Sequence, residues 1–451
     1  MVRQISGLAG TIYEAIRDAP IVSPHGHCDP AWFAQNNAFS DPAELLVIPD
    51  HYVFRMLYSQ GIALRDLGIG IAPQERDPRV IFRLFASNWH LFLGTPSHIW
   101  ITHVLEKTIG CSADLSADTA DDIYDQIADW LTDPANRPRA LFERFNIEVL
   151  ATTDGALDPL DDHKAVQSSD WSGRVVPTFR PDAVLDPMMP GWAHEVARLG
   201  RITDHDTRGF NGYLAALQTR RKAFKAVGAT ATDHAIEQPA TCWLDAPETI
   251  YAQLLAGDMT HAAAFHGHML VEMAQMSVED GLVMQLHAGS RRNTNRSVLN
   301  AFGRDKGADI PIAVDWVRGL EPLLNRVGND PRLTLILFTL DENTYARELA
   351  PMAGHWPCLR IGPPWWFHDS PAGIARYFDQ VVETAGYHNL AGFNDDTRAF
   401  LSIPARHDMW RRCVAIHLAE QIRRGYFSAA TATELANHLT HGLARSTYRL
   451  G

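Results

Sequence analysis

The hydrophobic positions of the chain gather into eight short, mostly apolar runs, and each run ends in polar or aromatic residues. Along the chain they cover 20–27, 147–154, 174–182, 226–234, 281–289, 333–341, 358–366 and 390–398. Between most of them the apolar residues recur at helical spacing, as in 373–387 and 409–422. Alternating strands and helices predict a parallel sheet, and eight such units predict an α/β fold of the closed (β/α)8 barrel type.

Two stretches exceed a minimal barrel and are interpreted as helical insertions. Residues 31–146, after strand one, are rich in aromatic residues and in helical spacing, and residues 237–278, after strand four, are mostly helical in pattern. Both are expected to cap or flank the strand ends. Because the sequence contains no internal repeat, low-complexity tract or linker, we expect one barrel domain over residues 1–451.

Charge and cysteine content narrow the class of protein. The net charge is −13 at pH 7 and the chain has no long basic run, which argues against nucleic acid or a membrane surface as a partner. Five scattered cysteines without CxxC spacing favour reduced thiols. The first twenty residues lack the apolar core of a signal peptide, and no run is long enough to span a bilayer. We therefore expect a cytoplasmic globular protein.

Chemically useful side chains fall at the predicted strand ends, where barrel enzymes build their sites. In chain order they are His25, Asp154, Arg180, Asp233, His287, Asp341, Trp366 and Asp396. Polar residues also end strands because turns are polar, so single members of this set could be turn formers. The recurrence at all eight runs favours a constructed site.

The stretch PHGH places His25 and His27 two residues apart after the first run. On an extended chain such residues point the same way, so both imidazoles could face one metal ion; a polar surface turn is the alternative. Strands one and eight become neighbours in a closed barrel, which brings Asp396 or Asp395 within reach. Two imidazoles and one carboxylate suit zinc or another divalent metal and leave positions open for substrate. His287 is either a further ligand, a substrate contact or a packed core histidine.

Cationic and aromatic residues near the same ends predict an anionic small molecule as the ligand. Arg180, Arg398 and Arg406 carry guanidinium forks that bind carboxylates, although each could instead pair with a protein carboxylate such as Asp182 or Asp408. His51 and Tyr52 in the first insertion could lie over the metal, or Tyr52 could be a core aromatic. Trp366 could stack on a sugar or plug the barrel.

Together these motifs resemble the uronate isomerase (glucuronate isomerase) family of the amidohydrolase superfamily. The resemblance runs along most of the chain through HxH at 25–27, DHY at 50–52, GTPSHIWITHVLEKTIG at 94–110, TFRPD at 178–182, QLHAGSRRNTN at 285–295 and WWF.D at 365–369. The most specific segment is DDTRAFLS followed by RHDMWRR, at 395–412. One departure is Asp395, which stands where the family has threonine and adds a carboxylate that could compete for the metal.

The resemblance implies a distorted barrel with one divalent metal, commonly zinc, and interconversion of D-glucuronate with D-fructuronate and of D-galacturonate with D-tagaturonate. It implies a metal held by His25, His27 and Asp396. It further implies Asp396, Tyr52, Arg398 and His51 in catalysis, and substrate contacts from Arg180, His287, Trp366 and Arg406. The partner expected on this basis is a small-molecule sugar acid, and the chain is expected to form a homo-oligomer.

An aldose–ketose isomerisation needs a base at C2, stabilisation of the enediolate and a cationic group for the uronate carboxylate, and the set above contains each. No GxGxxG follows a strand, so no redox cofactor is expected. The alternative is a metal-dependent hydrolase or deaminase of the same superfamily, in which the metal activates water. That reading requires further histidine ligands, and the sixth run ends in TLD, without a histidine.

Overall fold

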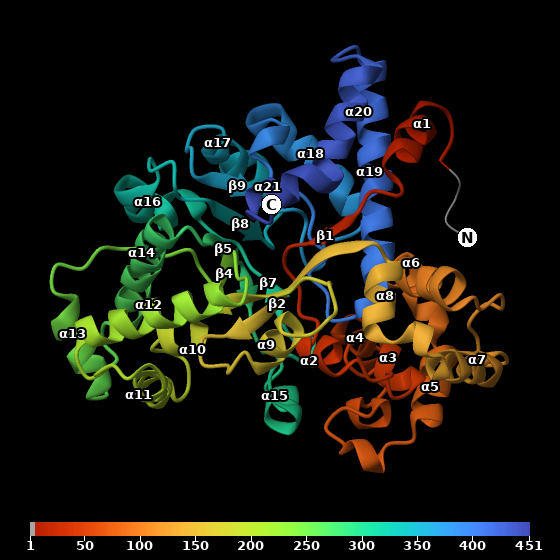
Figure 1. The fold of residues 1–451 in the computed structure, drawn as a ribbon, viewed down its shortest axis with the longest axis horizontal. Helices are drawn as coiled ribbons and strands as arrows, with labels where there is room; N and C mark the ends of the chain where they lie inside the picture. The colour runs from red at the N-terminus through yellow and green to blue at the C-terminus, as the bar shows by residue number, and fades with distance from the viewer. Residues whose placement is uncertain (1–4) are drawn as a thin grey trace.

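A computed structural model describes residues 5–451, and in this part of the chain seven parallel strands form one curled sheet (Figure 1). In spatial order they are β1 (Ile21–Ser23), β2 (Ile147–Gly155), β3 (Val175–Arg180), β4 (Ala231–Ile236), β5 (Val283–Ala288), β8 (Leu335–Thr339) and β9 (Leu359–Ile361). Seven of the eight predicted strands are thereby confirmed. The pair β6 (Ser290–Arg291) and β7 (Ile310–Pro311) makes a small antiparallel ribbon after β5.

Helices separate successive strands of the sheet and continue after β9, as the spacing of apolar residues predicts. From β2 onward they are α9 (Asp161–Gln167), α10 (Asp182–Leu185), α11 (Trp192–Thr203), α12 (Phe210–Ala226), α13 (Pro247–Leu255), α14 (Ala262–Asp280), α15 (Arg296–Phe302), α16 (Trp316–Val327), α17 (Ala350–Ala353), α18 (Pro371–Ala385), α19 (Ile403–Arg423), α20 (Ala429–Asn437) and α21 (Leu443–Thr447). The buried faces of the larger helices join the strands in one continuous core, which includes Leu286 of β5 and Met269 of α14.

The segment between β1 and β2 is helical and has a core of its own. Helix α1 (Gly7–Ile16) precedes β1, and the segment contains α2 (Pro30–Gln35), α3 (Pro42–Leu46), α4 (His51–Ser59), α5 (Pro78–Ser87), α6 (Pro96–His103), α7 (Ala120–Thr132) and α8 (Pro138–Arg144). Its aromatic residues, such as Phe82 and Phe85, are buried together, and the same cluster includes Leu150 of β2 and Val175 of β3. The segment therefore packs against one edge of the sheet, next to β1 and β2 (Figure 1).

The eighth run, predicted as a strand over 390–398, is not a regular strand. It forms a single parallel bridge between Leu390 and Ile361, and its backbone leaves the extended conformation at Gly392 and Asp396, where φ is +83° and +39°. Residues with left-handed backbone angles cannot continue a strand ladder. The run nevertheless lies between β9 and the end of β1, because the His27 N–H donates to the Thr397 carbonyl at 2.9 Å.

The C-terminal residues lie at the amino ends of the strands. The Arg449 guanidinium donates to the carbonyls of Gly281 and Arg332, just before β5 and β8, both at 2.6 Å. The Tyr448 hydroxyl donates to Gln285 of β5 at 3.1 Å, within a cluster of residues from the strands that includes Val149 and Ile336. With the amino ends covered, the carboxyl ends remain for a site.

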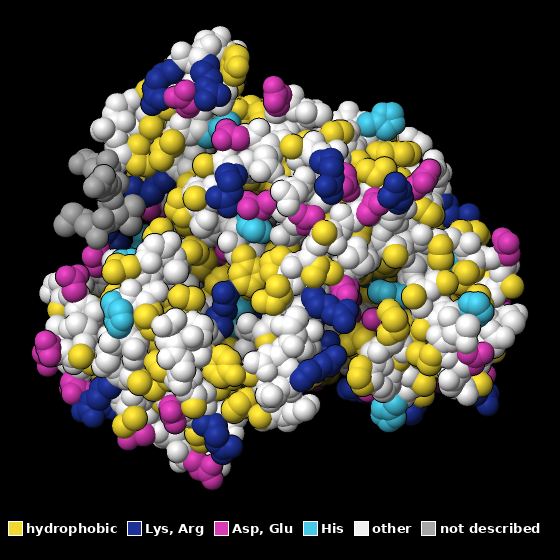
Figure 2. Space-filling model, turned by 180° about the vertical axis from the view of Figure 1, so that it is seen from behind, with side chains coloured by type: hydrophobic (Ala, Val, Ile, Leu, Met, Phe, Trp, Pro, Cys, Tyr) yellow, Lys and Arg dark blue, Asp and Glu magenta, His cyan; other side chains and the backbone are white. Residues whose placement is uncertain are grey.

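The surface seen in Figure 2 mixes basic, acidic and hydrophobic side chains. Among residues 5–451, no helix combines the length and the apolar character that a membrane crossing requires.

Candidate active site

A cavity of about 820 Å³ opens at the carboxyl ends of the strands. The side chains to which the family resemblance assigns a metal, catalytic or substrate role all line it: His25, His27, His51, Tyr52, Arg180, His287, Trp366, Asp396, Arg398 and Arg406. They come from the loop after β1, from α4, β3 and β5, from the segment after β9, from the eighth run and from α19. The cavity is thus assembled from residues nearly 400 positions apart in sequence.

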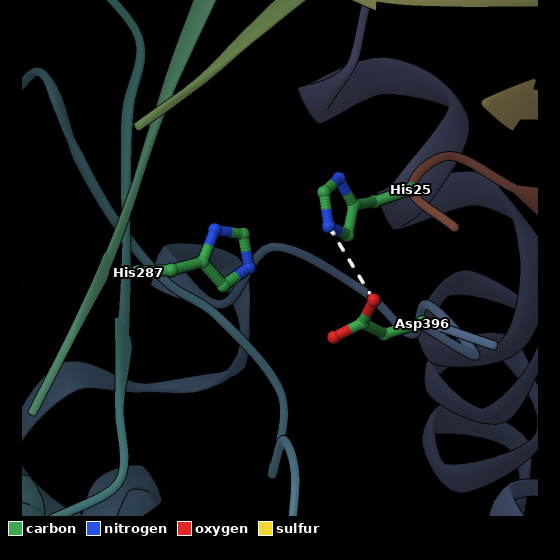
Figure 3. A group of neighbouring side chains, drawn as sticks. All are labelled: His25, His287 and Asp396. Atoms are coloured by element: carbon green, nitrogen blue, oxygen red, sulfur yellow. Dashed lines mark ion pairs between the residues drawn. The ribbon is translucent and has the colours of Figure 1, made fainter. Parts of the chain in front are cut away.

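Three of these side chains converge at the floor of the cavity. His25, His287 and Asp396 point toward one another, and one ligand atom from each lies within 4.8 Å of the others (Figure 3). His25 Nε2 lies 3.5 Å from Asp396 Oδ1, and the rings of His25 and His287 stack with centroids 4.7 Å apart. The His27 Nε2 lies 3.0 Å from the same Asp396 oxygen.

The geometry of this cluster fits a divalent metal. Two donors held at about 2.1 Å by one tetrahedral zinc lie roughly 3.4 Å apart, close to the separations of His25 and His27 from Asp396. Asp396 Oδ1 is buried and faces both imidazoles, but among the described residues it makes no hydrogen bond of good geometry. Burial lowers the pKa of His25 to about 4, so its imidazole is neutral and able to coordinate. Burial opposes the charge of Asp396, but His27 and His25 hold the pKa of its carboxyl below the ordinary value.

The backbone around the two histidines differs from the extended chain that the HxH spacing suggests. Strand β1 ends at Ser23, so His25 and His27 stand on a loop, with their rings at 81° to each other and centroids 5.4 Å apart. The loop is held by the Thr153 hydroxyl, which donates to the Gly26 carbonyl at 2.9 Å. Asp396 reaches the histidines from a left-handed backbone conformation, which is uncommon outside glycine and recurs at functional sites.

His287 is oriented by a carboxylate behind it. Its Nδ1 lies 2.6 Å from Asp233 Oδ1, and because an ionised carboxylate only accepts, Nδ1 carries the proton and Nε2 is left with its lone pair. Nε2 is buried and has no partner among the described residues. This is the arrangement that carboxylates impose on metal-ligating histidines.

The three arginines of the site have different surroundings. Arg180 lies between Asp182 at 2.8 Å and Asp233 at 3.3 Å, and Arg406 is buried against Asp369 at 3.0 Å. Arg398 is exposed to the cavity and makes no hydrogen bond or ion pair with any described residue. Of these three arginines, Arg398 is therefore the one whose charge no protein carboxylate neutralises, and its guanidinium is available to an incoming anion.

Residues of the helical segment form one wall of the cavity. Asp50 caps α4 by accepting from the Tyr52 N–H at 2.8 Å, which places His51 and Tyr52 in the first turn. Burial, with the nearby charges of Arg398 and Arg55, lowers the pKa of His51 to about 3, so this imidazole is neutral. Trp366 meets the His51 ring edge to face, with centroids 5.2 Å apart.

Three carboxylates proposed from the sequence do not join the metal cluster. Asp395 turns away to His407, with Oδ2 3.1 Å from Nε2, so it is not positioned to compete with Asp396. Asp154 is buried and accepts from Thr152 at 2.7 Å, and Asp341 accepts from the Asn343 N–H at 3.1 Å. Neither lines the cavity; as ends of strands they serve local structure.

Sequence reasoning missed two basic residues, Arg292 and Arg304, which line the cavity from the segment between β5 and α16. The paired arginines in HAGSRR after the fifth run were the available signal for Arg292, and no such pair marks Arg304. Arg292 pairs with Asp309 at 3.2 Å, which ties one side of this segment together.

Comparison with known proteins identifies the family. The model of the glucuronate isomerase family matches residues 5–446. The chain belongs to this family. A uronate isomerase from Rhizorhabdus wittichii is 55% identical over 447 residues, covering 98% of this chain and 95% of that protein.

Solved structures agree with this family. The crystal structure of glucuronate isomerase from Caulobacter crescentus matches with a TM-score of 0.97 and 49% identity, over 98% of this chain and 94% of the other. Uronate isomerase from Thermotoga maritima matches with a TM-score of 0.94 and 26% identity, over 99% of both chains. Family and fold are therefore shared along nearly all of the described chain.

Proposed function

We propose that the protein is an aldose–ketose isomerase that interconverts D-glucuronate with D-fructuronate and D-galacturonate with D-tagaturonate. The observation that carries the proposal is the full-length similarity to uronate isomerases, at 55% identity in one relative. The cavity supports it, because one pocket joins a carboxylate, a tyrosine and an arginine free of protein carboxylates. No comparison favours the hydrolase or deaminase alternative.

The reaction moves a proton from C2 to C1 and leaves the carbonyl at C2. Asp396 is the carboxylate placed to act as base, and Arg398 is the cation placed to bind the substrate carboxylate or the enediolate oxygen. Tyr52 and the neutral His51 contact hydroxyl groups of the substrate from the wall formed by α4. His287, Trp366, Arg180 and Arg406 border the substrate, with the last two arginines neutralised by protein carboxylates.

We propose His25, His27 and Asp396 as ligands of one divalent metal, with zinc as the preferred ion and His287 as a neighbour able to join them. A bound divalent ion would polarise substrate oxygens and favour removal of the adjacent proton. The residues of the chain orient the sugar acid, keep water out and hold the protons.

We also propose a more specific description of the fold. The eighth run occupies the gap between β9 and β1, which supports a distorted (β/α)8 barrel in a single domain, with residues 31–146 and 237–278 as helical insertions.

The test is incubation of the purified protein with each uronate in deuterated water, followed by NMR. We expect a ketose from at least one of the two acids, with deuterium at C1 unless the base shields the proton during transfer. Absence of ketose from both acids, together with hydrolysis of an amide or ester library, would replace the isomerase with the hydrolase.

A further inference from the structure

The Tyr52 hydroxyl is held by two groups that lie behind the cavity wall. It donates to the Asp369 carboxylate, with Oδ2 at 3.1 Å and Oδ1 at 3.2 Å, and it accepts the backbone N–H of Phe367 at 3.3 Å. Both partners come from the segment after β9, whereas Tyr52 comes from the first turn of α4. Asp369 is 8% exposed and does not line the cavity.

These contacts determine whether the Tyr52 hydroxyl donates a hydrogen bond to a ligand or accepts one from it. The phenol hydroxyl has one hydrogen, and it donates this hydrogen in a hydrogen bond to the Asp369 carboxylate, which can only accept. The Phe367 N–H occupies one lone pair of the oxygen. What Tyr52 offers the cavity is therefore its remaining lone pair, an acceptor for a substrate hydroxyl.

Asp369 is itself fixed in place. Arg406, 3% exposed, donates to Asp369 Oδ2 at 3.0 Å, and its guanidinium lies 3.5 Å from the centroid of the Trp100 ring. Phe367, whose N–H donates to the phenol at 3.3 Å, has a φ of +67°, a strained backbone conformation for a residue other than glycine. Burial raises the pKa of Asp369 and raises that of Tyr52 well above its ordinary value, so the phenol remains protonated while the carboxylate gains proton affinity.

We propose that Asp369 is a positioning residue that makes Tyr52 a hydrogen-bond acceptor and proton acceptor for a substrate hydroxyl. The inference rests on the proposed isomerase function. Isomerisation removes a proton from the C2 hydroxyl and places one on the oxygen at C1. As a hydroxyl proton passes to the Tyr52 oxygen, the Tyr52 proton passes to Asp369; both steps reverse when the product hydroxyl forms, so no proton is gained or lost.

The test is a double-mutant cycle on the full chain with Asp369→Asn, Tyr52→Phe and both together, measuring kcat and KM for the uronate that turns over. We expect Asp369→Asn to lower kcat by roughly 10- to 100-fold and KM by less than about 3-fold, because a positioned proton acceptor acts in the transition state. In the Tyr52→Phe background the same change should cost less than about 3-fold. Losses that multiply would show that Asp369 acts independently of Tyr52 and overturn the proposal.

The control is Asp280→Asn, which removes another carboxylate from a buried arginine, Arg221, at 2.6 Å; neither residue lines the cavity. It should lower stability and leave kcat within about 2-fold. If Asp369→Asn does not fold, Asp369→Glu keeps a charge for Arg406 but displaces the carboxylate from Tyr52, and its kcat should fall.

An unchanged kcat in a folded Asp369→Asn variant overturns the role of Asp369. If only Asp369→Glu folds, an unchanged kcat in that variant does the same. Failure of the unmodified protein to isomerise either uronate would instead overturn the proposed function.

Discussion

The two ends of the sheet use the same strands for different purposes. At the amino ends the C-terminal residues satisfy backbone groups, as Arg449 does for the carbonyls of Gly281 and Arg332. At the carboxyl ends polar atoms are buried without a hydrogen-bond partner in the described chain, among them His287 Nε2 and His25 Nδ1. A buried polar atom without a hydrogen bond costs about 1–3 kcal/mol of stability. The carboxyl ends of the strands are therefore less stable than they could be, and their polar atoms remain available to bind a ligand.

Removing the paired histidines should have the largest effect on this comparison. His25→Ala with His27→Ala should abolish metal binding and lower kcat by at least about 10³-fold, because two of the proposed ligands are lost. Metal content by mass spectrometry after dialysis, together with ketose formation, measures both. The exposed pair His194→Ala with His355→Ala is the matched control and should keep both properties. Full metal occupancy in the first double variant would refute the assignment.

Arg398 tests whether the unpaired guanidinium serves the ligand. Arg398→Lys should lower kcat/KM by roughly 10- to 100-fold, since lysine keeps the charge but loses the bidentate fork, while the free energy of unfolding stays within about 0.5 kcal/mol. Arg423→Lys, at an exposed pair with Glu420, is the control. Unchanged kcat/KM in Arg398→Lys would make Arg398 a surface residue.

Arg449 tests the opposite end of the sheet. Arg449→Met removes the hydrogen bonds to Gly281, Arg332 and Thr334 and should lower the free energy of unfolding by roughly 1–2 kcal/mol. Because these groups lie away from the cavity, kcat should stay within about 2-fold. Urea unfolding and steady-state kinetics measure the two effects. A lower kcat at unchanged stability would contradict the conclusion that the amino ends of the strands serve stability and the carboxyl ends serve the ligand.

Asp154 should give the smallest effect, and it depends on pH. Burial raises the pKa of Asp154 to about 7, so the folded state holds a proton that the unfolded state releases near pH 4. Stability is therefore lost as pH rises between these values, and the charged carboxylate is a cost at pH 8. Asp154→Asn should raise the free energy of unfolding by about 1 kcal/mol at pH 8 and much less near pH 4. A gain of equal size at both pH values would exclude this cause.

Much of the fold could be predicted because strands and helices have local causes. The apolar runs at 147–154 and 281–289 became β2 and β5, since buried parallel strands need continuous hydrophobic residues. The prediction of a strand over the eighth run was wrong because Gly392 and Asp396 adopt left-handed backbone angles. Such angles depend on close tertiary contacts, which the pattern of apolar residues does not show. Gly392, for example, lies so near Ala444 that a side chain there would clash.

The candidate site, like the fold, could be predicted from the sequence only in part. The sequence by itself determined which side chains stand at the carboxyl ends, because parallel strands deliver their ends to one edge, and it matched the chain to a family through motifs such as DDTRAFLS. Only the tertiary structure decided that Asp396 faces the histidines while Asp395 faces His407, and that Arg406 is neutralised by Asp369 while Arg398 is free of protein carboxylates. Pairing of charges acts over a few ångströms in space, and residues 37 positions apart, such as Asp369 and Arg406, meet only when the chain has folded.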